Sequence, residues 1–305
     1  RPDRRDALLI LGALHSEHTR DARKAAGCYE RALALDPWDA DTGVALARVW
    51  DEAEEPLEAL SVLRRVMEIR PADVSIKCMA ANNLLSRRDR DCFPLFEEAL
   101  ELDPNHVEGL RGYGVALRVL DRDHASAQAA YRIALRLKPD DAATLVNMGV
   151  LAASSEQVDV GDAMDWFRKA IATDPKNVHA HLERGILYEE SCMDIEAAED
   201  YYLQAAKWGQ RSALKGERQA SADALSRAAR LRWRYLNETR RARAMYESAL
   251  TVCPNHPAAT RQLAALLSEL GSDDPSRCLY LNALRLTPGD ADAWGELADL
   301  HVRAG

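Results

Sequence analysis

The spacing of the prolines constrains this sequence more than any other feature. Five of them follow one another at intervals of 34, 33, 35 and 36 residues, and two more lie 34 residues apart near the C-terminus. The prolines of this series are Pro37, Pro71, Pro104, Pro139, Pro175, Pro254 and Pro288. A period of 34 residues is the length of a helix, a turn and a second helix. The sequence therefore predicts a repeated helical hairpin.

The phrase around each proline is repeated as well. The stretch ALELDPNHVEGLRGYG at 99–114 has close variants, among them YRIALRLKPDDAATLVNMG from Tyr131 and FRKAIATDPKNVHAHLERG from Phe167. Proline ends the second helix of each repeat and forces the preceding residue out of the helical region. A polar residue after the proline is placed to cap the next helix. The expected caps are Asp39, Asp73, Asn105, Asp140, Asn177, Asn255 and Asp290.

Aligned on this period, the repeats resemble the tetratricopeptide repeat (TPR) family. That family places large or apolar residues at positions 4, 7 and 11, Gly or Ala at 8, Ala at 20 and 27, an aromatic residue at 24 and Pro at 32. The fourth repeat follows this pattern with Leu110, Gly114, Tyr131 and Pro139. The resemblance implies an all-α, right-handed α-solenoid of about eight TPR helix-turn-helix units and a terminal helix. Because no hairpin buries its apolar face alone, stability is expected to come from stacking.

We expect a single continuous array over residues 1–305. Its repeats are predicted at roughly 5–38, 39–72, 73–105, 106–140, 141–176, 177–210, 211–255 and 256–289, followed by a half repeat at 290–305. The gap from Pro175 to Pro254 is 79 residues, which is two periods and an insertion of 11, and Gly209 stands where the missing proline would be. The insertion, within 210–222, predicts a longer first helix or an extra helical turn before it.

Composition excludes some classes of function. The net charge is −9, with 49 acidic and 40 basic residues, so overall charge gives no support to nucleic-acid binding. No run of eighteen apolar residues occurs, so no membrane insertion is expected. The six cysteines lie far apart without a C-x-x-C pair, which is typical of packing residues in a reducing, cytoplasmic or cytoskeletal location. Since the chain begins without Met, we expect it to be part of a longer protein.

The resemblance also points to a partner-binding groove. In TPR proteins, positions 2, 5, 9 and 12 of the first helices line the concave side. In repeats four to six, the candidate groove residues are Arg111, Val115, Arg118, Val146, Asn147, Val150, Leu182, Ile186 and Glu189. The apolar members have two interpretations. They are either half-buried against neighbouring first helices, or a strip that binds an apolar or amphipathic peptide.

A basic segment forms the second candidate site. Residues 211–243 carry ten bases and three acids, a local charge of +7. The candidate basic patch consists of Arg227, Arg230, Arg232, Arg234, Arg240 and Arg241. It is suited to an acidic tail, a phosphorylated segment or RNA. Alternatively, residues 183–200, with seven acids and one arginine, neutralise it within the molecule, because adjacent repeats pack together.

The sequence lacks motifs of catalysis. No phosphate-binding loop, nucleophile elbow or H-E-x-x-H occurs. His179 and His181 lie two apart on a helix and point in different directions, whereas His15 and His18 share a face but have no third ligand. No metal, no cofactor and no enzymatic activity are therefore expected within this segment.

One peptide-binding subtype of the family is also not expected. The two-carboxylate clamp of chaperone-binding TPR proteins is matched in part by Arg111 and Asn147. However, Val115 stands where its first asparagine should be, and His179 and Glu183 replace its last two bases. The clamp is therefore incomplete in this sequence.

These observations predict a non-catalytic protein-protein interaction scaffold, an adaptor within a multi-subunit assembly that grips an extended or helical partner segment. Two alternatives stay open. One is an RNA-processing factor, because residues 242–257 (ARAMYESALTVCPNHP) resemble the half-a-TPR repeats of such proteins. The other is the regulatory array of an enzyme whose catalytic part lies outside this segment.

Overall fold

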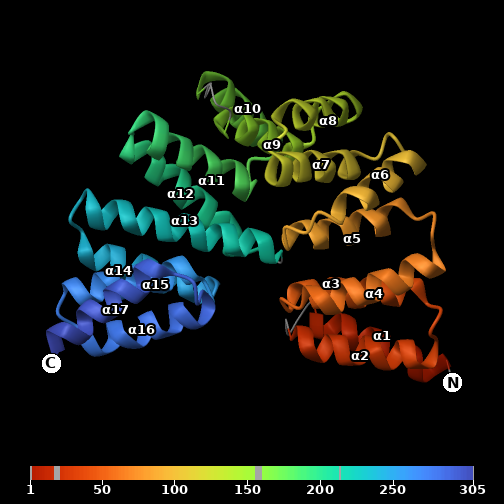
Figure 1. The fold of residues 1–305 in the computed structure, drawn as a ribbon, viewed down its shortest axis with the longest axis horizontal. Helices are drawn as coiled ribbons and strands as arrows, with labels where there is room; N and C mark the ends of the chain where they lie inside the picture. The colour runs from red at the N-terminus through yellow and green to blue at the C-terminus, as the bar shows by residue number, and fades with distance from the viewer. Residues whose placement is uncertain (1, 17–20, 155–159, 213, 305) are drawn as a thin grey trace. The chain divides into compact units, whose positions relative to one another are not determined.

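The computed structural model describes residues 2–16, 21–154, 160–212 and 214–304, and these residues form helices and turns without a strand. The chain divides into two compact units, Arg1–Leu151 and Ala152–Gly305, called here the N-terminal unit and the C-terminal unit. Within each unit the helices lie in stacked pairs (Figure 1). Each unit is therefore a stack of helical hairpins.

The helix bounds follow the predicted repeats. The N-terminal unit contains α1 (Pro2–Leu14), α2 (Ala22–Leu35), α3 (Ala40–Glu52), α4 (Pro56–Ile69), α5 (Val74–Ser86), α6 (Cys92–Leu102), α7 (Val107–Ala116), α8 (His124–Leu137) and most of α9 (Ala142–Ser154). The C-terminal unit contains α10 (Val160–Thr173), α11 (Val178–Leu187), α12 (Ile195–Gly209), α13 (Lys215–Arg234), α14 (Thr239–Val252), α15 (Pro257–Glu269), α16 (Asp273–Leu286) and α17 (Ala291–Ala304). Consecutive first helices also pack together, as α11, α13 and α15 do. The prediction of an all-α solenoid is confirmed, and a continuous array over both units stays a prediction.

A glycine and an aromatic residue set the distance between the two helices of a hairpin. The aromatic side chains of the second helices are almost fully buried, namely Phe96, Tyr131, Phe167, Tyr202, Tyr246 and Tyr280. A Cβ atom on Gly114 would lie 2.5 Å from Cε1 of Tyr131, and one on Gly185 would lie 2.6 Å from Cε1 of Tyr202. These distances are shorter than van der Waals contact. Glycine at this position therefore makes room for the ring.

The helix caps occur at a fixed distance from the prolines. Asp39, Asp73, Asn177 and Asp290, each two residues after a proline, accept backbone N–H groups as predicted. The prediction is wrong by one residue for Asn105, Asp140 and Asn255, where the caps are His106, Asp141 and His256. A histidine can replace an acid because its unprotonated Nδ1 accepts a hydrogen bond. The N–H groups of Gly109 and Ala259 donate to these Nδ1 atoms at 3.0 Å.

The insertion in the seventh repeat lengthens its first helix. Helix α13 has 20 residues, whereas α11 has 10 and α15 has 13. This confirms the first of the two predicted accommodations. The added turns pack on Gly209 at the end of α12, where a Cβ atom would lie 2.5 Å from the carbonyl oxygen of Glu217 and 2.6 Å from Cβ of Ser221. Glycine in place of the missing proline therefore permits close contact between α12 and α13.

Two smaller irregularities follow α7 and α11. The segments Leu117–Asp121 and Tyr188–Cys192 are single π-helical turns, and each ends at a residue in the left-handed region, Arg122 and Met193, both at φ 54°. A π-turn accommodates one extra residue without ending the helix. The interval from Pro104 to Pro139 is 35 residues, one more than the period, and the π-turn after α7 takes up the extra residue.

Candidate binding surfaces

The predicted groove residues of the N-terminal unit lie on α7, the π-turn after it and α9. The half-buried ones are Arg111, Val115, Arg118, Asn147 and Val150. Val146 is only 6% exposed and belongs to the core. Val115 and Val150 are therefore the predicted apolar groove residues of this unit that solvent reaches.

Arg111 joins α7 to the beginning of α9. Its guanidinium lies 3.0 Å from Asp141, which also accepts hydrogen bonds from the backbone N–H of Thr144 at 3.1 Å and its hydroxyl at 2.6 Å. Burial raises the pKa of Asp141, but the hydrogen bonds from Thr144 and the charge of Arg111 outweigh it and hold the pKa below its ordinary value. Arg111 is therefore engaged within the unit, and its neighbour Arg118 has no ion pair with any described residue.

The predicted groove residues of the C-terminal unit pack against α13. Leu182 is 6% exposed and shares a hydrophobic cluster with Ala220, Ala224 and Ala228. Ile186 is half-buried against the same cluster. This packing supports the first interpretation in the C-terminal unit, namely burial against a neighbouring first helix.

Glu189 is the centre of a buried polar network. Its carboxylate is 9% exposed, accepts a hydrogen bond from the hydroxyl of Tyr202 at 2.6 Å, and pairs with Arg227 at 3.3 Å and with Arg230. Burial and the hydrogen bond to Glu189 raise the pKa of Tyr202 well above its ordinary value. The network links the π-turn after α11 to α12 and α13.

Most of the predicted basic patch is paired with acids of the same unit. Arg227 and Arg230 pair with Glu189, and Arg232 pairs with Glu199, so acids of the run 183–200 neutralise these arginines. The intramolecular interpretation is confirmed for these three arginines. Arg234 pairs with Glu269 at 3.0 Å, and Arg241 pairs with Glu238 at 3.0 Å. Within the described residues, Arg240 is exposed and makes no ion pair.

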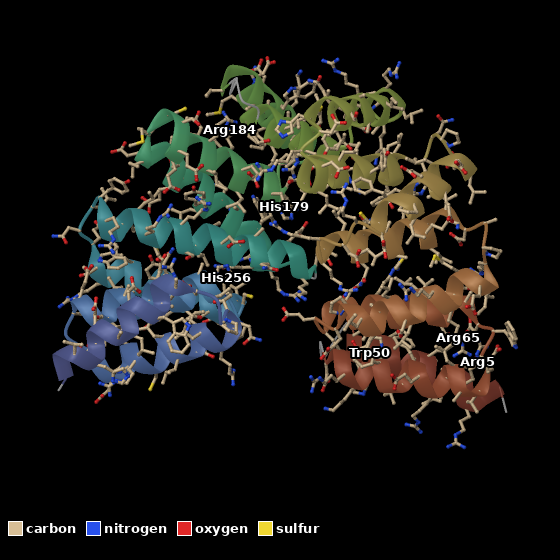
Figure 2. All side chains as sticks on the ribbon, in the orientation of Figure 1. Arg5, Trp50, Arg65, His179, Arg184 and His256 are labelled. Carbon is tan, nitrogen blue, oxygen red and sulfur yellow. The ribbon has the colours of Figure 1, made fainter. Side chains whose placement is uncertain are left out.

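An aromatic cluster near α11 was not predicted from the sequence. The rings of Tyr188 and Tyr201 are stacked with centroids 5.4 Å apart, and the guanidinium of Arg184 lies 4.6 Å from the centroid of Tyr201. Arg184 is labelled on α11 in Figure 2. Such a stack holds a cation by its attraction to the ring faces. It fixes the π-turn after α11 to α12.

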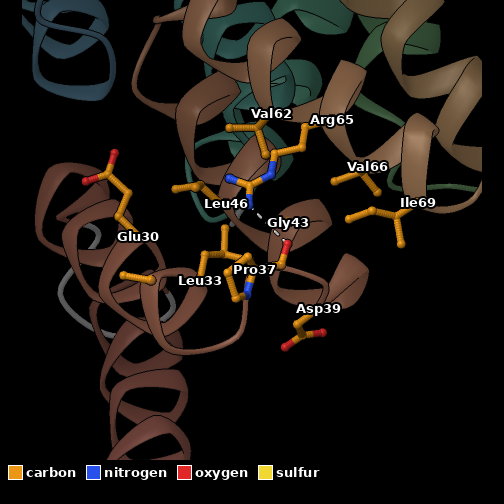
Figure 3. A pocket seen from close by; sticks show the side chains of 11 residues that line it. Glu30, Leu33, Pro37, Asp39, Gly43, Leu46, Val62, Arg65, Val66 and Ile69 are labelled. Carbon is orange, nitrogen blue, oxygen red and sulfur yellow. Dashed lines mark hydrogen bonds between the residues drawn. The ribbon is translucent and has the colours of Figure 1, made fainter.

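The N-terminal unit also has a cavity that the sequence analysis missed. It has a volume of about 380 Å³ and lies between α2, α3 and α4 (Figure 3). Its lining is formed by Glu30, Leu33, Ala34, Pro37, Asp39, Gly43, Leu46, Val62, Arg65, Val66 and Ile69. The sequence carries no single signal for this cavity, because its walls come from three helices of two successive repeats.

The described residues form neither a metal site nor a membrane-spanning helix. Among those that the structure describes, no group of three His, Cys, Asp or Glu side chains could hold a metal ion. His18 lies outside the described residues. Over the same ranges, the helices are too short or too polar to cross a bilayer.

The hairpin geometry agrees with comparisons to known proteins. The sequence profile of the family described as "Tetratricopeptide repeat" matches residues 94–142 and 121–178. Among solved structures, yeast Tom70 is similar with a TM-score of 0.73 and 17% identity over 98% of this chain and 64% of that chain. Cut9 in the APC/C hetero-tetramer Cut9–Hcn1 is similar with a TM-score of 0.62 and 14% identity over 96% and 54%. Residues 94–178 of this chain therefore match the tetratricopeptide repeat, and the chain has the same fold as these solved structures.

The relatives found by sequence are longer than this chain. The peroxisomal targeting signal receptor of Candida albicans is 25% identical over 206 residues, which are 64% of this chain and 34% of the relative. Superkiller protein 3 of Saccharomyces cerevisiae is 25% identical over 136 residues, 42% of this chain and 9% of the relative. The chain thus spans about a third or less of the curated relatives that it matches.

Proposed function

We propose that the chain is a non-catalytic protein-interaction scaffold, an adaptor subunit in a larger cytoplasmic or cytoskeletal complex. In this proposal it binds an extended or helical partner segment on the first-helix face of α7 and α9. The observation that carries the proposal is the partial exposure of Val115 and Val150 on the first helices of two successive repeats. Apolar side chains left in partial contact with water on a rigid helical surface are typical anchor points for a peptide.

The polar groups beside these valines support the same proposal. Arg118 has no ion pair with a described residue, and the Arg111–Asp141 pair ties α7 to the N-terminus of α9. The two valines therefore lie on helices that are already fixed to each other, so binding a partner costs little conformational entropy of this chain. The names of the relatives agree with a binding role, since one describes a targeting signal receptor and a structural neighbour is solved as a hetero-tetramer.

The test is affinity purification followed by mass spectrometry with the Val115→Asp, Val150→Asp double variant. A matched control is Leu281→Asp, because Leu281 is 52% exposed and lies on α16. We expect partners recovered with the wild type to be lost from the double variant and kept by the control. Circular dichroism checks that the variants are folded. Equal recovery of every partner with all three proteins would rule out this surface.

The RNA-binding alternative has little electrostatic support. Its predicted arginines are mostly committed to ion pairs, and Arg240 is the unpaired one among the described residues of the patch. The structure of human IFIT1 with m7Gppp-AAAA is similar with a TM-score of 0.61, but its 18% identity, over 87% of this chain and 67% of that chain, concerns the fold alone. We therefore expect no mobility shift of single-stranded RNA at low salt.

A further inference from the structure

The α2–α3–α4 cavity lies between the second helix of the first repeat and both helices of the second repeat. Position 4 of the fourth and fifth repeats holds Leu110 and Leu145, which are 7% and 4% exposed. The second repeat has Gly43 at this position, and Gly43 lies in the wall of the cavity. A Cβ atom on Gly43 would lie 2.4 Å from Cγ2 of Val66, so Val66 fills the place next to Gly43 and both residues form part of the wall. The volume of the cavity, about 380 Å³, is near the lower end of the range for ligand pockets.

The lining of the cavity is mostly apolar and includes the cation of Arg65. Figure 3 shows Leu33, Leu46 and Val62 around the space and the guanidinium of Arg65 over it. The carboxylate of Glu30 points away from the cavity in the same view. An occupant therefore meets an apolar surface with a cation beside it.

The charge of Arg65 is available to an occupant. Its guanidinium donates a hydrogen bond to the carbonyl oxygen of Pro37 at 3.2 Å and makes no ion pair with any described residue. The nearby Asp39 is already engaged, since it pairs with Arg5 and accepts a hydrogen bond from the backbone N–H of Thr42 at 3.3 Å. A guanidinium has five N–H donors, so Arg65 keeps donors for a carboxylate.

We propose that this cavity binds a segment of a partner protein that inserts one large apolar side chain and pairs an adjacent Asp or Glu with Arg65. The space accommodates a large apolar side chain, and the cation of Arg65 favours an acidic neighbour. The site is separate from the α7–α9 surface proposed above, and neither proposal depends on the other.

The test uses methyl NMR of the whole chain with blocked tetrapeptides as probes. The first probe is acetyl-Gly-Asp-Phe-Gly-amide, which has its carboxylate only on Asp. The second replaces Asp by Asn, and the third replaces Phe by Ala. We expect the first peptide to shift the methyl resonances of Val62, Val66 and Ile69 in a saturable manner. Removing the carboxylate should weaken binding about three- to fivefold, and removing the ring should weaken it by roughly tenfold or more.

Two variants assign the effect to Arg65. In Arg65→Gln, the Asp and Asn peptides should bind equally, whereas Arg64→Gln, the neighbouring exposed arginine outside the lining, should keep the difference. Absence of methyl shifts with the first peptide would overturn the site. Equal affinity of the Asp and Asn peptides for the wild type, or equal affinity of the Phe and Ala peptides, would overturn the proposed ligand. Both variants alter exposed side chains, so folding is expected to be kept.

Discussion

Replacement of Glu189 by Ala should destabilise the C-terminal unit more than replacement of any exposed acid. Its carboxylate satisfies the hydroxyl of Tyr202 and the guanidinium groups of Arg227 and Arg230. Without it, the phenol of Tyr202 in the core loses its acceptor and Arg230 loses its counter-ion. Arg227 keeps only its pair with the exposed Glu190. The perturbation thus removes one partner from a network and leaves the others in place.

The magnitude follows from the burial of each partner. Tyr202 is fully buried, and leaving a buried hydroxyl unsatisfied costs about 1–3 kcal/mol. The side chains of Arg227 and Arg230 are 31% and 39% exposed, so they reach water and contribute less than the roughly 3–5 kcal/mol of a fully buried pair. We expect a total loss of about 3 kcal/mol for Glu189→Ala. Glu189→Gln keeps an acceptor for Tyr202 and should lose about 1–2 kcal/mol.

The assay is urea denaturation followed by circular dichroism, with hydrogen exchange of the amides of α12 and α13. Exchange is needed because repeat arrays need not unfold in one step. The control is Glu190→Ala, since Glu190 is 60% exposed and its pair with Arg227, at 3.4 Å, is worth less than about 1 kcal/mol. If Glu189→Ala and Glu190→Ala lost equal stability, the network would not hold these helices together and the reasoning would be refuted.

Three further predictions concern packing, pH and thiol reactivity. In thermal unfolding, Gly114→Ala should lower the free energy of unfolding by about 1–3 kcal/mol, because the new Cβ atom would overlap the ring of Tyr131. Gly216→Ala, whose Cβ atom would lie in open space within α13, should raise it by up to about 1 kcal/mol. The pKa of Asp141 lies below the ordinary 3.8, so its carboxylate stabilises the folded unit above that pH, and this stabilisation is lost as the pH falls through the folded pKa. In Asp141→Asn, the free energy of unfolding should therefore depend less on pH in the acid range. Burial raises the pKa of the Cys78 thiol to about 11, so a thiol reagent at pH 8 should modify the exposed Cys192 much faster.

The hairpins could be predicted because prolines recur in the sequence at the length of one repeat. Proline cannot continue a helix, so each proline marks the same point of the repeat. The predicted cap is wrong where the residue directly after the proline is also a good capping residue. Asn105 is such a residue, but the cap is His106, two residues after Pro104 as in the other repeats. A constant distance from the proline is the better guide.

The candidate surfaces were harder to predict because exposure depends on the neighbouring repeat. Leu182 stands at a position that faces the groove in the family, but the longer α13 packs over it. The cavity beside Gly43 could not be predicted from one repeat, because its walls come from three helices of two successive repeats. A sequence pattern shows which side chains each repeat carries, whereas the exposure of a side chain also depends on the neighbouring repeat that packs against it.

Charges in such a stack should therefore be compared across one period before they are assigned to a partner. Arg5 pairs with Asp39, 34 residues away, and Arg232 pairs with Glu199, 33 residues away. Both separations are close to the repeat length, because the same face of the next hairpin lies beside the charge. A basic run and an acidic run in adjacent repeats consequently neutralise each other, whatever their net charge suggests separately. A charge that finds no partner one period away, as at Arg65, is the better indication of a binding site.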